Sequence, residues 1–308
     1  MDRRLASESS SHDTVEYASG IRTLSDGSVL PQPVQVDLGA ASHCGLVRPN
    51  NEDHYAAVRR IRKRDILKTN VDVSDLVLPE DHAYVLVVAD GVGGRGFGEL
   101  ASELVLRLGW DVASQMPCWI MKFDDRLMFK IREQVESYAR QIQAALQEEI
   151  RSNPALAGMG TTWTCVYTMG TDAIVAHAGD SRAYRFHRGT LKQLTRDHTL
   201  AQEMQTLGMP AEEAARFKHM LTNSFGGPGG EVVTDVEHVP LEDGDRILLC
   251  TDGLTDMATD LQIAEVLARV SGSQAAADAL IDLALAHGGK DNVTAIVADY
   301  RVSAGGPA

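Results

Sequence analysis

The sequence predicts an α+β fold in which antiparallel sheets are covered by helices. Several short runs rich in Val, Ile and Leu are typical of strands, and many of them follow one another with only Gly-containing turns between them. The two longest helical patterns stand next to each other and do not alternate with strands. A strictly alternating order would predict a parallel sheet, so this order favours antiparallel sheets with helices on their outer faces.

The predicted strands are short and apolar. The run AYVLVVA at 83–89 is apolar throughout, which is typical of a strand buried on both faces. One more strand is expected directly after residue 53. The other predicted strands span 162–168, 173–178, 183–187, 246–250 and 292–301.

Two long helices are predicted at 98–114 and 127–151, because apolar residues recur there at i, i+3 and i+4 and no proline interrupts them. Shorter helices are expected at 200–207, 260–270 and 274–287.

The domain organisation follows from composition. Residues 1–33 are rich in Ser and poor in apolar side chains, so we interpret them as a flexible tail. Residues 34–302 form the predicted folded domain, and 303–308 (SAGGPA) a second tail. Residues 59–80 are interpreted as an insertion between two strands, and 116–129 as extra material between the long helices.

The overall composition is that of a soluble globular protein, with 44% hydrophobic and 23% charged residues in 308. The net charge of −14 disfavours binding to nucleic acid and to anionic membrane. The N-terminus has no apolar signal region, and no apolar run approaches the ~18 residues of a membrane span. The four cysteines form no CxxC motif, so we expect reduced thiols and a cytoplasmic protein.

Two apolar strands end in the same way, with an Asp followed by a Gly. Asp90-Gly91 follows LVVA, and Asp252-Gly253 follows LLCT. A single Asp-Gly pair is most simply a turn, but two pairs after matched buried strands favour a site. Glycine at these points lets the backbone turn sharply and approach a ligand closely.

Asp53 and Asp291 stand at two further strand boundaries, so four aspartates could meet at one edge of a packed sandwich. Converging carboxylates repel one another, and bound cations would offset this repulsion. Ligands that are all oxygen suit Mg or Mn, and two such ions are a recurrent solution for phosphoester hydrolysis. Arg48 could grip two phosphate oxygens, although a solvated surface role is an equal alternative at this point.

Eight short motifs in one order make the sequence resemble the metal-dependent protein phosphatases of type 2C, in particular their bacterial branch. The motifs run from about residue 36 to 301, and each alone is weak. They are RPNNED at 48–53, ADGVGG at 89–94, GMGTT at 158–162, GDSR at 179–182, LTRDH at 194–198, LT at 221–222, CTDGL at 250–254 and KDNVT at 290–294.

The resemblance implies a four-layer αββα sandwich with a metal cleft at one edge. It also implies hydrolysis of phosphoserine and phosphothreonine in proteins by a hydroxide that bridges two Mn or Mg ions, without a phosphoenzyme. By position, the metal ligands would be Asp53, Asp90, Asp252, Asp291 and the backbone carbonyl of Gly91. Glu52 would hold metal-bound water, and Arg48 would bind the substrate phosphate. The implied partners are a phosphorylated protein and a cognate Hanks-type Ser/Thr kinase.

Several motif residues have a structural interpretation. Residues 158–162 would shape a tight turn, Asp180 and Arg182 would form a hydrogen-bonded pair, and His198 would anchor a loop and not ligate metal. The stretch 199–230 matches a flap beside the cleft.

The sequence departs from the family pattern in two places. Bacterial relatives commonly carry an Asp just before GMGTT for a third metal, but residues 153–157 hold no acid, which puts a third metal in doubt. Arg95 replaces a His that many relatives have after the Gly-Gly pair, and it would face solvent or aid phosphoprotein binding.

Three alternative functions remain. A catalytically dead binding protein would require loss of metal ligands, and all four aspartates are present. A phosphatase dedicated to one anti-sigma or secretion-linked partner would commonly lack the Arg that stands here at 48. A metal-dependent phosphoesterase of another fold would not explain the ordered motifs.

Overall fold

A computed structural model describes residues 34–63, 65–70, 81–93, 97–115, 125–227 and 230–302. The predicted tails at 1–33 and 303–308 lie outside the described residues, as do Arg95, half of the stretch interpreted as an insertion and most of the stretch interpreted as extra material. Within the described part, no helix combines the length and the apolarity needed to cross a membrane.

Two antiparallel sheets form the centre of the fold. The five-stranded sheet has the order β1 (Val34–His43), β11 (Val293–Val302), β10 (Arg246–Cys250), β7 (Arg182–His187) and β8 (Thr190–Gln193). The six-stranded sheet has the order β2 (Asp53–Arg62), β3 (Asp81–Val92), β5 (Trp163–Met169), β6 (Asp172–Ala178) and β9 (Asp235–Pro240), with β4 (Gly160–Thr161) paired to the end of β3.

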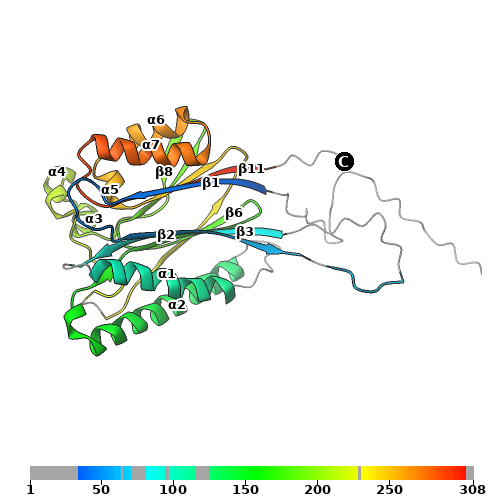
Figure 1. Ribbon diagram of the computed structural model, residues 1–308, viewed down its shortest axis with the longest axis horizontal. Coiled ribbons are helices and arrows are strands. Elements are labelled where there is room, and N and C mark those ends of the chain that lie inside the picture. Colours follow the sequence, from blue (N-terminus) through cyan, green and yellow to red (C-terminus); the bar gives the residue numbers. More distant parts are fainter. Residues whose placement is uncertain are drawn as a thin grey trace, which may run out of the picture.

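Helices cover the outer face of each sheet, as Figure 1 shows. The helices α1 (Phe97–Gln115) and α2 (Asp125–Ser152) pack on the six-stranded sheet. The helices α6 (Asp260–Arg269) and α7 (Ser273–Ala286) pack on the five-stranded sheet. A third apolar cluster lies between the two sheets. The predicted four-layer αββα sandwich is therefore confirmed.

The continuous apolar run in β3 is explained by burial on both faces. Val85 and Val87 point into the cluster under α1 and α2, whereas Leu86 and Val88 point into the cluster between the sheets. A half-exposed strand would have alternated polar and apolar residues.

Short helical elements lie in the connections between the longer helices and strands. They are η2 (Pro154–Leu156), α3 (Leu200–Thr206), α4 (Ala211–Ala214), η3 (Ala215–Phe217) and α5 (Asp252–Thr255). Figure 1 places α3, α4 and α5 together at one end of the sheets.

The predicted strands and helices all occur, with ends that shift by at most three residues. No continuous apolar run marks β1, β8 and β9 in the sequence, because each lies at an edge of a sheet and carries polar residues at alternate positions, so these strands were not predicted. The insertion does not begin at residue 59: residues 59–62 continue β2, paired to β3, and Ile61 alternates with basic residues. The basic residues obscured this strand because an edge strand exposes one face.

Candidate metal centre

Strand ends bring four predicted ligands to one edge of the sandwich. Asp53 opens β2 and lies directly opposite Asp90 in the β2–β3 pairing. Asp252 opens α5 just after β10, and Asp291 precedes β11, the neighbour of β10. The charges of Asp252 and Asp291 both act on the Asp53 carboxyl, so the two sheets contribute to one cluster.

Asp53 is the most enclosed of these carboxylates. Its side chain is 5% exposed. One oxygen, Oδ2, accepts hydrogen bonds from the hydroxyls of Thr251 and Thr294, both at 2.8 Å. The other oxygen, Oδ1, is buried without a hydrogen-bond partner among the described residues. Burial raises the pKa of Asp53 to about 7 despite the two hydroxyls, and Asp252 and Asp291 add to the rise.

The neighbouring carboxyls are perturbed in the same direction. Burial raises the pKa of Asp90 well above its usual value, and the charges of Asp53 and Asp252 raise it further. Burial, Asp256 and Asp291 raise the pKa of Asp252 to about 6. Each shift means that the ionised form is disfavoured in the protein alone. A bound divalent cation would reverse this penalty, so the orphaned Oδ1 and the all-oxygen donor set fit Mg or Mn.

The backbone of Asp90 is held by the threonines of the GMGTT motif. Thr162 donates its N–H to the Asp90 carbonyl and accepts the Asp90 N–H on Oγ1, both at 2.9 Å. The hydroxyl of Thr161 donates to the same carbonyl at 2.9 Å. These residues were expected only to shape a turn, and they also fix where the Asp90 side chain begins.

Two glycines allow the close packing at this edge. A Cβ on Gly91 would lie 2.3 Å from the Gly98 carbonyl oxygen and 2.7 Å from that of Glu52. A Cβ on Gly253 would lie 1.9 Å from the backbone oxygen of Asn292. The glycine of each Asp-Gly pair is therefore required by the approach of a neighbouring backbone.

Arg48 lies beside the cluster on an exposed loop. Its Nη2 donates to Oδ2 of Asp291 at 2.7 Å, and 56% of its side chain is exposed. The hydrogen bond to Asp291 raises the pKa of Arg48. The side chain of Asn292 holds this loop, accepting from the Glu52 N–H at 2.7 Å and donating to the Asn50 carbonyl at 2.8 Å.

Glu52 lies next to this loop and against α1. Its Oε2 is so close to Gly98 that a Cβ there would lie 2.5 Å away. Partial burial raises the pKa of Glu52, and Arg48 opposes the rise. The structure thus places Glu52 close enough to Arg48 for their charges to interact, while the contact of Glu52 with metal-bound water stays a prediction.

Asp180 also belongs to the carboxylate cluster, although the sequence motif predicted only a structural role for it. Burial raises its pKa well above the usual value, and Asp252 is the largest charge acting on it. The predicted pair between Asp180 and Arg182 is wrong, because Arg182 binds Asp197 with Nε and Nη2 at 2.9 and 2.7 Å. Adjacency in sequence was misleading here, since residues 180 and 182 point to different neighbours.

The flap segment reaches the centre through two basic residues. Lys218 Nζ lies 2.9 Å from Oδ1 of Asp256, and His219 Nδ1 lies 3.6 Å from Oδ2 of the same residue. The side chains of His219, Asp252 and Asp256 each bring a ligand atom within 4.8 Å of the others. No sequence signal pointed to His219, because it lies outside the recognisable motifs.

His198 anchors loops, as predicted. Its Nδ1 accepts from the Gly179 N–H at 3.2 Å and from Nδ2 of Asn223 at 2.8 Å. Its Nε2 donates to Oδ2 of Asp235 at 3.1 Å. Because Asn223 lies in the flap, His198 ties the flap to the strand that carries Asp235.

Comparisons with known proteins agree with this geometry. The model of the protein phosphatase 2C family matches residues 70–286. The serine/threonine phosphatase stp of Listeria welshimeri is 30% identical over 251 residues, covering 80% of this chain and 96% of that protein. PstP of Mycobacterium tuberculosis is 33% identical, covering 84% of this chain and 44% of that protein. The crystal structure of the PstP catalytic domain with two manganese ions superposes with a TM-score of 0.68 at 31% identity, covering 87% of this chain and 100% of the other.

A helix-covered pair of sheets with acidic strand ends at one edge, matched along most of its length by these relatives, defines a metal-dependent protein phosphatase. More particularly, the chain belongs to the protein phosphatase 2C family. Its activity is that of a serine/threonine phosphatase.

Proposed function

We propose that this chain hydrolyses phosphoserine and phosphothreonine in proteins at a centre of two Mn or Mg ions. The ligands would be the carboxylates of Asp53, Asp90, Asp252 and Asp291 with the backbone carbonyl of Gly91. The observation that carries the proposal is the buried Oδ1 of Asp53, which has no hydrogen-bond partner among the described residues. When bound, such ions polarise phosphoryl oxygens and lower the pKa of bound water.

The protein's own groups have separate roles in this proposal. Thr251 and Thr294 donate to Oδ2 of Asp53 and leave Oδ1 without a hydrogen-bond partner among the described residues, so Oδ1 would be available to an ion. Arg48 is exposed, and it would bind the substrate phosphate with the N–H groups that do not contact Asp291. Glu52, whose pKa is raised by burial, would hold a water molecule beside the centre.

A third ion would have a carboxylate available. The sequence put this ion in doubt because residues 153–157 contain no acid. However, Asp180 lies close enough to Asp252 for the charge of Asp252 to raise the pKa of Asp180. Asp180 is therefore the residue that we assign to any further ion.

The physiological setting is proposed from the family resemblance. The substrate would be a protein phosphorylated by a Hanks-type Ser/Thr kinase, and the chain would act in the cytoplasm. Manganese is supported by the PstP structure, whereas the oxygen ligands accept Mg equally well.

Hydrolysis of p-nitrophenyl phosphate and of a phosphothreonine peptide tests the proposal. The purified protein would be compared with Mn, with Mg and with EDTA. We expect metal-dependent phosphate release that EDTA stops. A folded protein that releases no phosphate with either metal would contradict catalysis and would favour the binding-protein alternative.

A further inference from the structure

The C-terminal end of the flap is held against the GMGTT motif. We call residues 224–227 the flap root. Phe225 forms an antiparallel bridge with Thr161, in which the N–H of each residue donates to the carbonyl of the other at 2.9 Å. The Phe225 side chain is buried and meets Trp163 of β5 edge to face, with 6.2 Å between ring centroids. Backbone and side chain together therefore fix the flap root to the six-stranded sheet.

Gly226 lets the flap root approach the motif closely. Its φ is +80°, in the left-handed region that favours glycine. A Cβ at this position would lie 2.7 Å from the Met159 carbonyl oxygen and 3.1 Å from the Cα of Gly160. Glycine supplies little conformational restraint of its own, so other groups have to hold this turn.

Two glutamines of α2 hold the turn at Gly226. Oε1 of Gln143 accepts from the Gly226 N–H at 2.8 Å, and Gln143 is 5% exposed. Nε2 of Gln147 donates to the carbonyls of Gly226 and Gly227, at 3.2 and 3.3 Å. The two glutamines stand at i and i+4, so they lie on one face of the helix. Their amides therefore pair with three backbone groups of the flap root, from a helix that lies before the motif in the chain.

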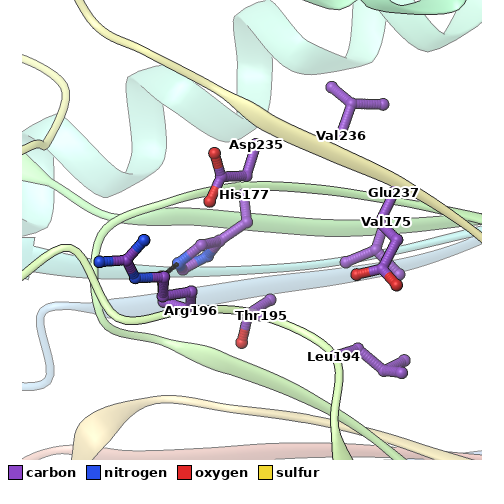
Figure 2. A pocket seen from close by; sticks show the side chains of 8 residues that line it. All are labelled: Val175, His177, Leu194, Thr195, Arg196, Asp235, Val236 and Glu237. Carbon is purple, nitrogen blue, oxygen red and sulfur yellow. Dashed lines mark hydrogen bonds between the residues drawn. The ribbon is translucent and has the colours of Figure 1, made fainter. Parts of the chain in front are cut away.

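The flap has a second anchor just before its root. Nδ2 of Asn223 lies 2.8 Å from Nδ1 of His198, and Nε2 of His198 lies 3.1 Å from Oδ2 of Asp235. Asp235 is paired with His177 between β9 and β6, and Figure 2 shows both side chains at the pocket that these strands line. This anchor holds Asn223, whereas the glutamines hold the root, which is the part that contacts the GMGTT motif.

The contact between the flap root and Thr161 leads directly to a proposed metal ligand. Thr161 donates its hydroxyl to the Asp90 carbonyl at 2.9 Å, while the Thr161 backbone is bridged to Phe225. A shift of the flap root would therefore move the residue that holds the backbone of Asp90. A ligand has to be held within about 0.5 Å of its productive position, so such a shift would weaken metal binding.

We propose that Gln143 and Gln147 are positioning residues of the metal centre, which act on Asp90 through the flap root and Thr161. The inference rests on the proposed function, because it takes Asp90 as a metal ligand. Groups that directly orient a ligand contribute about tenfold to a hundredfold to metal affinity. The glutamines act through two intermediate contacts, so we expect a smaller contribution of at least about threefold.

A purely structural role for the glutamines is the simpler explanation, because buried backbone groups of any loop need hydrogen-bond partners. The two roles differ in what they predict. With a structural role, loss of a glutamine lowers the free energy of unfolding and leaves the metal affinity of the folded protein unchanged. With a positioning role, the metal affinity of the folded protein falls as well.

Calorimetric titration of the whole chain with Mn distinguishes the two roles. Q143L and Q147L remove the amides, and Q141L, at an exposed position of α2, is the matched control. With each variant folded by circular dichroism, the dissociation constant for Mn should rise at least about threefold in Q143L and Q147L and change less than about twofold in Q141L. Equal Mn affinity in Q147L and the unsubstituted chain would overturn this inference alone. An unsubstituted chain that binds no Mn would contradict the proposed function and this inference with it.

Hydrogen exchange of the unsubstituted chain is a second test, which does not depend on any variant folding. Coupling between two sites is reciprocal, so Mn that fixes Asp90 should also steady the flap root. The amides of residues 225–227 should exchange at least about threefold more slowly with saturating Mn than with EDTA. The turn between β7 and β8, at the far end of β7 from Asp180, is the control and should exchange equally in both. Unchanged exchange at the flap root, in a chain that binds Mn, would show that the root and the metal centre are not coupled.

Discussion

Asp53 and Asp90 face each other across the β2–β3 pair, one at the start of its strand and one near the end of its partner. This pairing places two carboxylates of the same sheet side by side, and Asp252 from the other sheet completes the cluster. The cost of burying these acids together is visible in their raised pKa values.

Replacing Asp252 with Asn should lower turnover at least about a hundredfold, because the loss of one ligand charge weakens stabilisation worth several kcal/mol. The fold should persist, since the change removes a carboxyl whose charge is disfavoured by burial. Turnover with Mn and calorimetric Mn binding would be measured together. D282N, at an exposed position on α7, is the control, and normal Mn binding by D252N would remove Asp252 from the ligand set.

Replacing Arg48 with Ala should raise KM for a phosphopeptide by about tenfold to a hundredfold, which corresponds to the loss of hydrogen bonds between charged groups. The value of kcat should fall less, if the guanidinium grips substrate and transition state equally. Steady-state kinetics of R48A and R48K give both constants. An unchanged KM in R48A would exclude Arg48 from phosphate binding, and full recovery in R48K would show that charge alone suffices.

The aspartates of the centre could be recognised from the sequence, but the groups that orient them could not. An Asp-Gly pair after an apolar strand is a local pattern, so Asp90 and Asp252 could be found by reading along the chain. The hydroxyls of Thr251 and Thr294 meet on Asp53 from 198 and 241 residues away, a convergence that only the sheet pairing creates. Asp180 was misassigned for the same reason, because its neighbour in space is Asp252 and not the nearby Arg182.

Replacing Thr294 with Val should weaken Mn binding by about tenfold to a hundredfold, the usual effect of losing a group that orients a ligand. Valine keeps the shape of threonine, but Asp53 loses one of its two hydroxyl donors and Ser42 loses its partner at 2.8 Å. Mn affinity by calorimetry is the measurement. T190V, at an exposed position on β8, is the matched control, and equal affinities in the two variants would show that the hydroxyl does not orient Asp53.

Replacing Gly253 with Ala should destabilise the protein by about 1–3 kcal/mol or more, because overpacking forces the backbone to move. The added Cβ would meet the backbone oxygen of Asn292, which cannot rotate away as a side chain would. Urea unfolding of the metal-free protein measures the loss. G189A provides a contrast in which a Cβ meets nothing within 4 Å, although its φ of +84° adds backbone strain. A smaller loss in G253A than in G189A would contradict the close contact.

The metal-free protein should become less stable as the pH rises from about 4 to about 7. Unfolding returns Asp53 and Asp252 to ordinary pKa values near 4, whereas in the folded state burial raises them to about 7 and about 6. Between these limits the folded state holds more protons than the unfolded state, so the free energy of unfolding falls with increasing pH. Bound Mn replaces those protons and should reverse the trend, because it favours the ionised carboxylates.

Thermal unfolding at pH 5 and pH 7.5, with EDTA and with Mn, gives four melting temperatures that test this pH dependence. D53N should flatten the decline in EDTA, and a Tm that rises with pH in EDTA would show that these carboxyls are ionised without metal.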